Sequence, residues 1–222
     1  MVSAALPLFG SECSPPPDLE NPWNLGPHDL DALSQDIGSP ELVEKIVRPL
    51  SNNERGALEV RAHMHALFKE DFAAFEDAIR DLARQQEFLP RLETSKPLCR
   101  SGRPLSYARI RQKLAFRLLI FSRTYEYVLH YNFDESSRGN SALDVWWVLA
   151  EPLDDQIIET DGSWYFEEVE VNGERYTYMA YATHTVFRER KLGLQAALER
   201  FGERDVRNAM LAMREEAVRL SR

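Results

Sequence analysis

The most regular hydrophobic pattern in the chain is an alternation of apolar and polar residues that recurs in several segments. In residues 57–66 every second position is apolar, namely Leu58, Val60, Ala62 and Met64. The positions between them carry charged residues or histidine. Because the side chains of a strand point alternately to its two faces, this pattern predicts a strand with one buried and one solvated face.

Further strands are predicted along most of the remaining chain. Alternation, or enrichment in β-branched and aromatic residues, places them at 91–99, 107–121, 123–133, 143–149, 163–171 and 175–187. The clearest is the strand over 123–133, whose apolar face would carry Tyr125, Tyr127, Leu129, Tyr131 and Phe133. Asn172-Gly173 is a strong β-hairpin signal between the last two strands. Six or seven antiparallel strands are therefore expected.

Spacings of three and four residues predict two helices that pack on this sheet. A short one is indicated by Phe72, Phe75, Ile79 and Leu82, and Pro90 sets its outer limit. A longer one near the C-terminus has an apolar seam made of Val206, Met210, Met213, Ala217 and Leu220. The other faces of this helix are charged, so the seam must bury against another element, and we expect it to cross the concave face of the sheet.

The first 50 residues differ in composition from the rest of the chain. Residues 1–27 are rich in proline and include the run Pro15-Pro16-Pro17, which favours extended chain over a packed core. From Ser39, a cap residue, a proline at the first helical position, an early acid and late bases predict a helix that ends near Pro49.

The length of the chain, 222 residues, is sufficient for one folded domain. We place that domain at 51–222 and treat 1–50 as an N-terminal extension with a proline-rich tail and one helix. Apolar residues make up 44% of the chain and charged residues 28%, as in globular proteins. The formal net charge of -9 opposes binding to phosphate backbones or anionic lipid surfaces, so no nucleic-acid partner is expected.

Cysteine usage and apolar runs bear on the cellular compartment. Cys13 and Cys99 form no CxxC motif or Cys/His cluster, so neither a disulfide nor a zinc site is expected. The apolar run at 116–121 contains an arginine and is too short to span a bilayer, so no stable membrane insertion is expected. The first basic residue is Lys45, which leaves the N-terminus without the cationic region of an export signal. We expect a cytoplasmic protein, and an exported form if the true start lies upstream.

The order of strand, helix, long antiparallel sheet and long C-terminal helix resembles the START-like (SRPBCC) superfamily, which groups polyketide cyclases, coenzyme Q-binding proteins and lipid-transfer domains. Asp81 and Glu87-Phe88-Leu89-Pro90 are similar to the helix end and turn of that family. Gly162-Ser163-Trp164 resembles the start of one of its strands. The resemblance covers roughly Leu58 to the C-terminus. Where the family often has a Gly/Pro-rich loop before the last helix, residues 191–202 look helical and could act as a lid.

The resemblance implies an α+β, helix-grip (START-like) fold: a curved antiparallel sheet of six to seven strands wrapped around a long C-terminal helix, with a cavity between them. It implies that residues 51–222 bind or transport a hydrophobic small molecule, such as a lipid, an isoprenoid quinone or a polyketide-like compound, without a cofactor. The residues we select as ligand-binding are Tyr125, Tyr127, Tyr131, Trp147, Trp164, Tyr178, Met210 and Met213. The tyrosines could equally lie on the outer face of the sheet, and the methionines could equally be core.

Two alternative functions stay open. A polyketide cyclase or aromatase would need an acid or base, for which His130 and His184 are candidates, although structural histidines are more common. An interaction module would have a vestigial pocket and a protein partner bound through the N-terminal extension. His63 and His65 share a strand face but have no identifiable third ligand, so no metal site is expected. The usual signatures of nucleophilic, zinc-protease and nucleotide chemistry are missing, and no catalytic residue is assigned.

Overall fold

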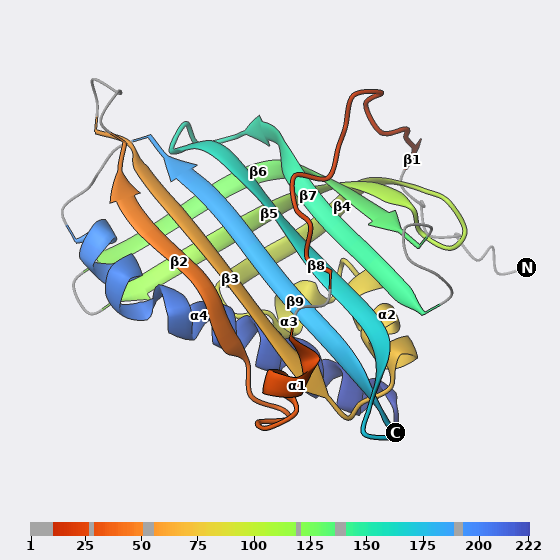
Figure 1. Cartoon of the computed structure of the whole chain (residues 1–222). Helices are drawn as coiled ribbons and strands as arrows, with labels where there is room; N and C mark the ends of the chain where they lie inside the picture. The colour runs from red at the N-terminus through yellow and green to blue at the C-terminus, as the bar shows by residue number, and fades with distance from the viewer. Residues whose placement is uncertain (1–10, 27–28, 51–55, 119–120, 136–140, 189–192) are drawn as a thin grey trace, which may run out of the picture.

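The computed structural model shows a curved sheet with one long helix along its concave side (Figure 1). It describes residues 11–26, 29–50, 56–118, 121–135, 141–188 and 193–222. The helices are α1 Leu30–Leu33, α2 Phe72–Arg80, α3 Gln85–Phe88 and α4 Leu194–Leu220. Helices α2 and α3 pack beside α4 on the same side of the sheet. Within these ranges no helix has the length and apolar composition needed to cross a membrane.

The sheet follows the order β1-β4-β5-β6-β7-β8-β9-β3-β2 in the described residues. The strand bounds are β1 Ser11–Glu12, β2 Glu41–Pro49, β3 Leu58–Phe68, β4 Leu92–Ser101, β5 Tyr107–Leu118, β6 Phe121–Asp134, β7 Ala142–Pro152, β8 Ile157–Val171 and β9 Glu174–Phe187. Every pairing is antiparallel except that of the two-residue β1 with β4. The predicted helix-grip architecture is confirmed, and the seven predicted strands correspond to β3–β9.

The helix predicted from Ser39 is wrong, because Glu41–Pro49 forms the edge strand β2. This strand pairs along its length with β3 and is the reason that the sheet has one antiparallel strand more than expected. The cap and charge signals at Ser39 are local and weak. Val43 and Val47 favour extended chain, and pairing with β3 hydrogen-bonds one edge of the segment, so tertiary context overrides the helical signals.

The main core lies on the concave face, between the sheet and α4. Tyr125, Tyr127, Leu129, Tyr131 and Phe133 all point into it, as their alternation predicts. From α4 it receives Val206, Met210, Met213 and Ala217. The predicted seam is therefore confirmed over these four residues, whereas Leu220 at the end of the helix is 38% exposed. The α4 seam also packs on α2, β3 and β2, which places the helix across the sheet.

The convex face of the sheet is covered in part by the N-terminal segment, which crosses β8 and β9 on its way to α1 (Figure 1). Leu25 and Leu33 bury against Tyr165, Tyr178 and Ala180 in a second apolar cluster. Residues before position 51 therefore contribute both to the sheet and to its outer covering.

The expectation of no disulfide is also wrong, because Cys13 and Cys99 are bonded to each other. Cys99 lies on β4, and the pairing of β1 with β4 brings the N-terminal segment to this strand. The sequence does not indicate that the two cysteines lie close together, since 86 residues separate them. A cross-link over such a long loop stabilises the fold mainly by restricting the unfolded chain.

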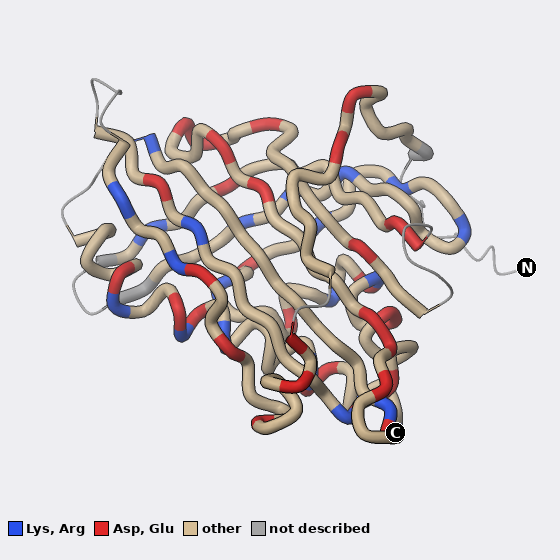
Figure 2. The backbone as a smooth tube through the Cα atoms, viewed as in Figure 1, with Lys and Arg blue, Asp and Glu red and all other residues tan. Residues whose placement is uncertain are grey.

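Charged side chains of both signs are interspersed along β2, β3 and α4 (Figure 2). Several form ion pairs across the surface, including Arg48 with Glu59 and Arg111 with Glu126. Exposed pairs of this kind contribute little to stability individually. The organisation of the fold therefore depends on apolar burial on the two faces of the sheet.

Gly162 provides a direct test of the packing on the concave face. It lies opposite Trp147 in the β7–β8 pairing, and a Cβ atom added there would be 2.1 Å from the Trp147 ring and 2.6 Å from the Ala182 carbonyl oxygen. We expect Gly162→Ala to lower the free energy of unfolding by about 1–3 kcal/mol, because the indole must move. Urea unfolding followed by tryptophan fluorescence measures this change.

The matched control is Gly202→Ala in α4, where an added Cβ meets no atom within 4 Å. Alanine is favoured over glycine inside a helix by about 1 kcal/mol, so this variant should be more stable than the wild type. If both variants unfolded at the wild-type urea midpoint, the close packing of Trp147 against β8 would be contradicted.

Candidate functional site

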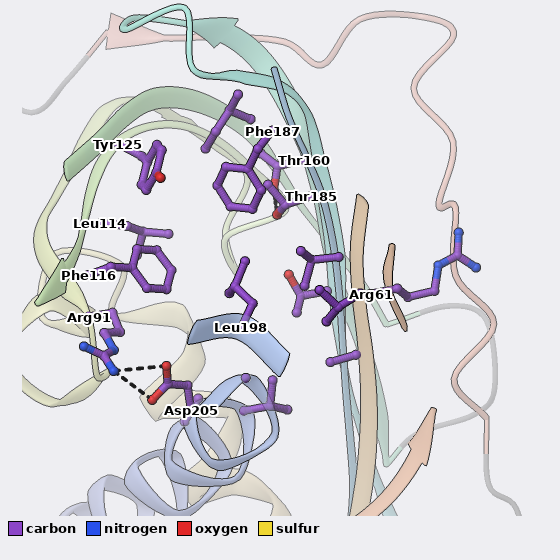
Figure 3. Close-up of a pocket in the computed structure, with 18 of the residues that line it drawn as sticks. Arg61, Arg91, Leu114, Phe116, Tyr125, Thr160, Thr185, Phe187, Leu198 and Asp205 are labelled. Atoms are coloured by element: carbon purple, nitrogen blue, oxygen red, sulfur yellow. Dashed lines mark hydrogen bonds and ion pairs between the residues drawn. The ribbon is translucent and has the colours of Figure 1, made fainter. Parts of the chain in front are cut away.

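An apolar cavity of about 160 Å³ lies between the concave face and the N-terminal half of α4 (Figure 3). Its walls come from β2, β3, β5, β6, β8, β9 and α4 and include Leu114, Phe116, Tyr125, Ile157, Phe187 and Leu198. Leu114, Phe116 and Tyr125 face Phe187 across this space. We call this space the outer chamber.

A second space of about 110 Å³, the inner chamber, adjoins the first and shares Leu114, Tyr127 and Tyr181 with it. Its further walls are largely aromatic. The rings of Trp164 and Tyr181 have centroids 4.0 Å apart, and further along, Tyr131 stacks on Trp147 at 5.4 Å. This stacking fixes the ring orientations and therefore the shape of the inner chamber.

Hydroxyl groups are the main polar feature of the inner chamber, and the outer chamber is lined by hydroxyl groups together with the charged residues Lys45, Arg61, Arg91 and Asp205. Burial raises the pKa of Tyr125 and of Tyr181 to about 12, and it also raises the pKa values of Tyr127 and Tyr131. All four phenols therefore stay protonated at neutral pH and can donate a hydrogen bond. Thr160 forms a hydrogen bond of 3.0 Å with the Thr185 hydroxyl, so part of this polar surface is already paired.

The edge of the outer chamber carries an ion pair between Arg91, at the start of β4, and Asp205 of α4 (Figure 3). The Arg91 Nη2 atom lies 3.1 Å from each carboxylate oxygen of Asp205. Its guanidinium group also lies 5.6 Å from the centroid of the Phe116 ring. Both ends of the pair line the chamber, so Arg91 connects the turn after α3 to the helix that covers the cavity.

The structure brings together five of the eight residues selected from the sequence. Tyr125 lines the outer chamber, Tyr127 lines both, and the inner chamber is lined by Tyr131, Trp147 and Trp164. Tyr178 lies instead in the apolar cluster on the convex face, on the opposite side of the sheet. Met210 and Met213 are fully buried in the main core and line neither chamber.

Several lining residues were missed by sequence reasoning, among them Gln112, Thr160, Thr183 and Thr185. A signal for Gln112 existed, because it falls in phase with Ile110 and Leu114 on an otherwise apolar strand face. A polar residue at such a position has to be paired or has to face a cavity. Thr183 and Thr185 likewise continue the phase of Tyr181 and Phe187 along β9, and Thr160 is in phase with Trp164 on β8.

Both candidate acid or base histidines lie on the convex face. His130 pairs through Nδ1 with the Tyr107 hydroxyl at 2.7 Å, and neither histidine lines a chamber. His184 Nδ1 lies 2.8 Å from a carboxylate oxygen of Asp161, which also accepts a hydrogen bond from the Trp23 indole. This ion pair thus helps to hold the N-terminal segment on the sheet.

The possible metal-ligand grouping in the described residues is Glu159, Asp161 and His184, not the pair His63 and His65. Its ligand atoms lie within 4.8 Å of one another. The hydrogen bond between His184 and Asp161 already accounts for two of these three side chains. The cationic Arg61 side chain also acts on His184, and this positive charge disfavours a metal ion at the site.

The His184–Asp161 pair predicts a pH dependence of stability. Its hydrogen bond raises the pKa of His184, and the nearby Glu159 acts in the same direction against the opposing effects of burial and Arg61. Glu59 also faces the ring, 3.5 Å from Nε2. A raised folded-state pKa means that the stabilisation is fully present below about pH 6.5 and is lost as the pH rises through the folded-state value.

We therefore expect the free energy of unfolding of the wild type, relative to that of His184→Gln, to fall as the pH is raised from about 6.5 into the alkaline range. Urea unfolding of both proteins across this range measures the difference. Parallel profiles for the two proteins would contradict a charged His184–Asp161 pair. His130→Gln is the control. Burial lowers the pKa of His130, so the contribution of this histidine to the free energy of unfolding rises with pH instead of falling.

Comparison with known proteins supports the fold at low sequence identity. No protein-family model matches the sequence, and no curated protein matches it. Human StAR-related lipid transfer protein 5 superposes with a TM-score of 0.59 and 8% identity, covering 87% of this chain and 93% of that chain. An aromatase/cyclase from a Streptomyces species gives a TM-score of 0.55 and 16% identity, covering 74% of this chain and 96% of that chain.

A StAR-related lipid transfer protein from Xanthomonas axonopodis gives a TM-score of 0.54 and 14% identity, covering 81% of this chain and 98% of that chain. The three similarities span both the lipid-transfer and the aromatase/cyclase types. At these identities they establish the architecture, so the protein has the START-like, helix-grip fold.

Proposed function

We propose that the protein binds a hydrophobic small molecule, of lipid, isoprenoid-quinone or polyketide-like type, in the two chambers beneath α4. The observation that carries this proposal is the cavity itself: apolar and aromatic walls with a few hydroxyl groups, enclosed by sheet and helix. This lining is typical of sites for apolar ligands. Structural similarity to lipid-transfer proteins and to an aromatase/cyclase supports the same interpretation.

Binding is favoured over catalysis by the chemistry of the lining. Among the described residues, Asp205 is the one carboxylate that lines either chamber, and Arg91 holds it in an ion pair. His130 and His184 lie across the sheet, beyond the reach of a ligand in the cavity. A cyclase or aromatase needs a group that can accept or donate a proton at the ligand, and for this role the chambers offer phenols and Lys45 but no histidine among the described residues. The enzyme hypothesis therefore remains the alternative.

The interaction-module hypothesis is also weakened by the structure. The described part of the N-terminal extension packs on its own sheet through Leu25 and Leu33, and Trp23 donates a hydrogen bond to Asp161. These side chains are therefore not available to a separate protein partner.

The Cys13–Cys99 disulfide bears on the compartment in which this function takes place. Disulfides persist in oxidising compartments and are rare in cytosolic proteins. This bond weighs against the cytoplasmic expectation and favours an oxidising compartment.

Gly202 allows the cavity to be blocked without damage to the core. This α4 residue lines the outer chamber, and a Cβ atom added there meets nothing within 4 Å. In Gly202→Leu, the new side chain should enter the chamber and weaken binding by more than tenfold, or about 1.4 kcal/mol. Stability should stay equal or rise, because leucine is a better helix former than glycine by about 0.8 kcal/mol.

Native mass spectrometry of the purified wild type and Gly202→Leu proteins would show whether a co-purified molecule is lost from the variant. Titration with N-phenyl-1-naphthylamine, a neutral fluorophore that brightens in apolar sites, gives the change in affinity. Gly202→Ala is the matched control and should bind almost as the wild type does. Unchanged binding by Gly202→Leu, or no binding by the wild type, would contradict the proposal.

A further inference from the structure

Three buried polar side chains of the inner chamber have no partner in the part of the chain that the structure describes. Gln112 is 6% exposed, Tyr127 is 4% exposed and Tyr131 is 3% exposed, and all three line the inner chamber. No hydrogen bond joins the Gln112 amide or either phenol to another described residue. Their polar atoms are not among the fully buried side-chain atoms without a partner in the described residues, so they face the space of the chamber, where a ligand can reach them.

These groups are clustered. Gln112 on β5 lies directly opposite Tyr127 in the β5–β6 pairing, and Tyr131 lies on the same face of β6. The phenols are close enough that a charge on Tyr127 or Tyr181 would raise the pKa of Tyr131. All three side chains therefore present hydrogen-bonding groups to the inner chamber.

The chemistry of the lining restricts that polar group to a neutral one. No charged side chain lines the inner chamber in the described residues. A carboxylate or ammonium group placed there would lose its hydration without gaining a counter-charge, which is strongly unfavourable. A carbonyl or hydroxyl oxygen can accept hydrogen bonds from the phenols and from the Gln112 amide, and a hydroxyl can also donate to the amide oxygen.

The volumes restrict the size of the ligand. The outer chamber measures about 160 Å³ and the inner chamber about 110 Å³. An engineered apolar cavity of about 150 Å³ in another protein accommodates benzene, so each chamber is on the scale of about one ring. Sites for drug-sized ligands are usually larger, at about 300–1,000 Å³. A four-ring sterol or a diacyl lipid exceeds this space.

We propose that the site selects a compact, neutral ring compound with a carbonyl or hydroxyl oxygen, which Gln112, Tyr127 and Tyr131 bind in the inner chamber while the apolar ring lies between Leu114 and Phe187. This inference rests on the proposed function and narrows it, because it excludes fatty acids and sterols as the preferred ligands. It also assigns Gln112 as a specificity-determining residue.

The test compares 2-naphthol with naphthalene, which has the same rings without the oxygen, and with palmitate, which carries a charge on a long chain. Isothermal titration calorimetry should show that the wild type binds 2-naphthol at least about tenfold more tightly than naphthalene, the gain expected from one or two net hydrogen bonds. Gln112→Leu and Tyr127→Phe should each reduce this preference by about threefold or more. The affinity of each of these two variants for naphthalene should change by less than about twofold, because the contacts with the rings remain.

Tyr176→Phe is the matched control, because the Tyr176 hydroxyl on the convex side binds Glu174 rather than the cavity. This variant should keep the wild-type preference for 2-naphthol. Equal affinity of the wild type for 2-naphthol and naphthalene, or a preference that survives in both cavity variants, would overturn the inference.

The same titrations separate this inference from the proposed function. If palmitate binds more tightly than 2-naphthol, and Gly202→Leu abolishes palmitate binding, the cavity holds a hydrophobic ligand but the selection described here is wrong. If none of the three compounds binds to the wild type, both proposals fail.

Discussion

The long helix α4, with α2 and α3 beside it, covers the concave face of the curved antiparallel sheet, and the rest of the structure depends on how α4 packs there. In its C-terminal half, Met210, Met213 and Ala217 are fully buried and fill the space between helix and sheet. In its N-terminal half, Leu198 lines the outer chamber, and Gly202 has no side chain to fill the gap. The cavity is the volume that this uneven coverage leaves.

The two faces of the sheet have different roles because alternate side chains of each strand point to opposite sides. On the concave face, stacked aromatic rings such as Trp147 and Trp164 build rigid walls around the inner chamber. On the convex face, polar residues such as His184 and Asp161 hold the N-terminal segment, together with the apolar contacts of Leu25. The ligand site and the attachment of this segment are thus built from the same strands, mainly from opposite faces of them.

Apolar contacts and hydrogen-bonding groups lie in different parts of the cavity. Most of the lining is apolar and supplies affinity without direction, since the hydrophobic effect is roughly proportional to the area removed from water. In the complex that we propose, direction comes from the few hydrogen-bonding groups in the inner chamber, of which Gln112 can both donate and accept. The ion pair of Arg91 with Asp205 keeps charge at the edge of the outer chamber, away from this region.

Much of this architecture could be predicted from the sequence, because alternation and three-four spacing report local geometry. The strand carrying Tyr127 and Tyr131, and the seam carrying Met210, follow from periodicity alone. Periodicity shows which residues share a face, but not which face meets the helix. Tyr178 was therefore assigned to the cavity although it lies on the convex side.

Only the tertiary structure decided the features that depend on distant segments. Glu41–Pro49 became a strand because β3 offers it a pairing edge, and Cys13 bonded to Cys99 because strand pairing brings them together. The sequence by itself determined the strands, the helix seam and the resemblance that led to the fold. The empty volume beside Gly202 and the exposure of the Gln112 amide to the inner chamber depend on how side chains from distant segments pack together in three dimensions. A pattern along the sequence does not contain this information.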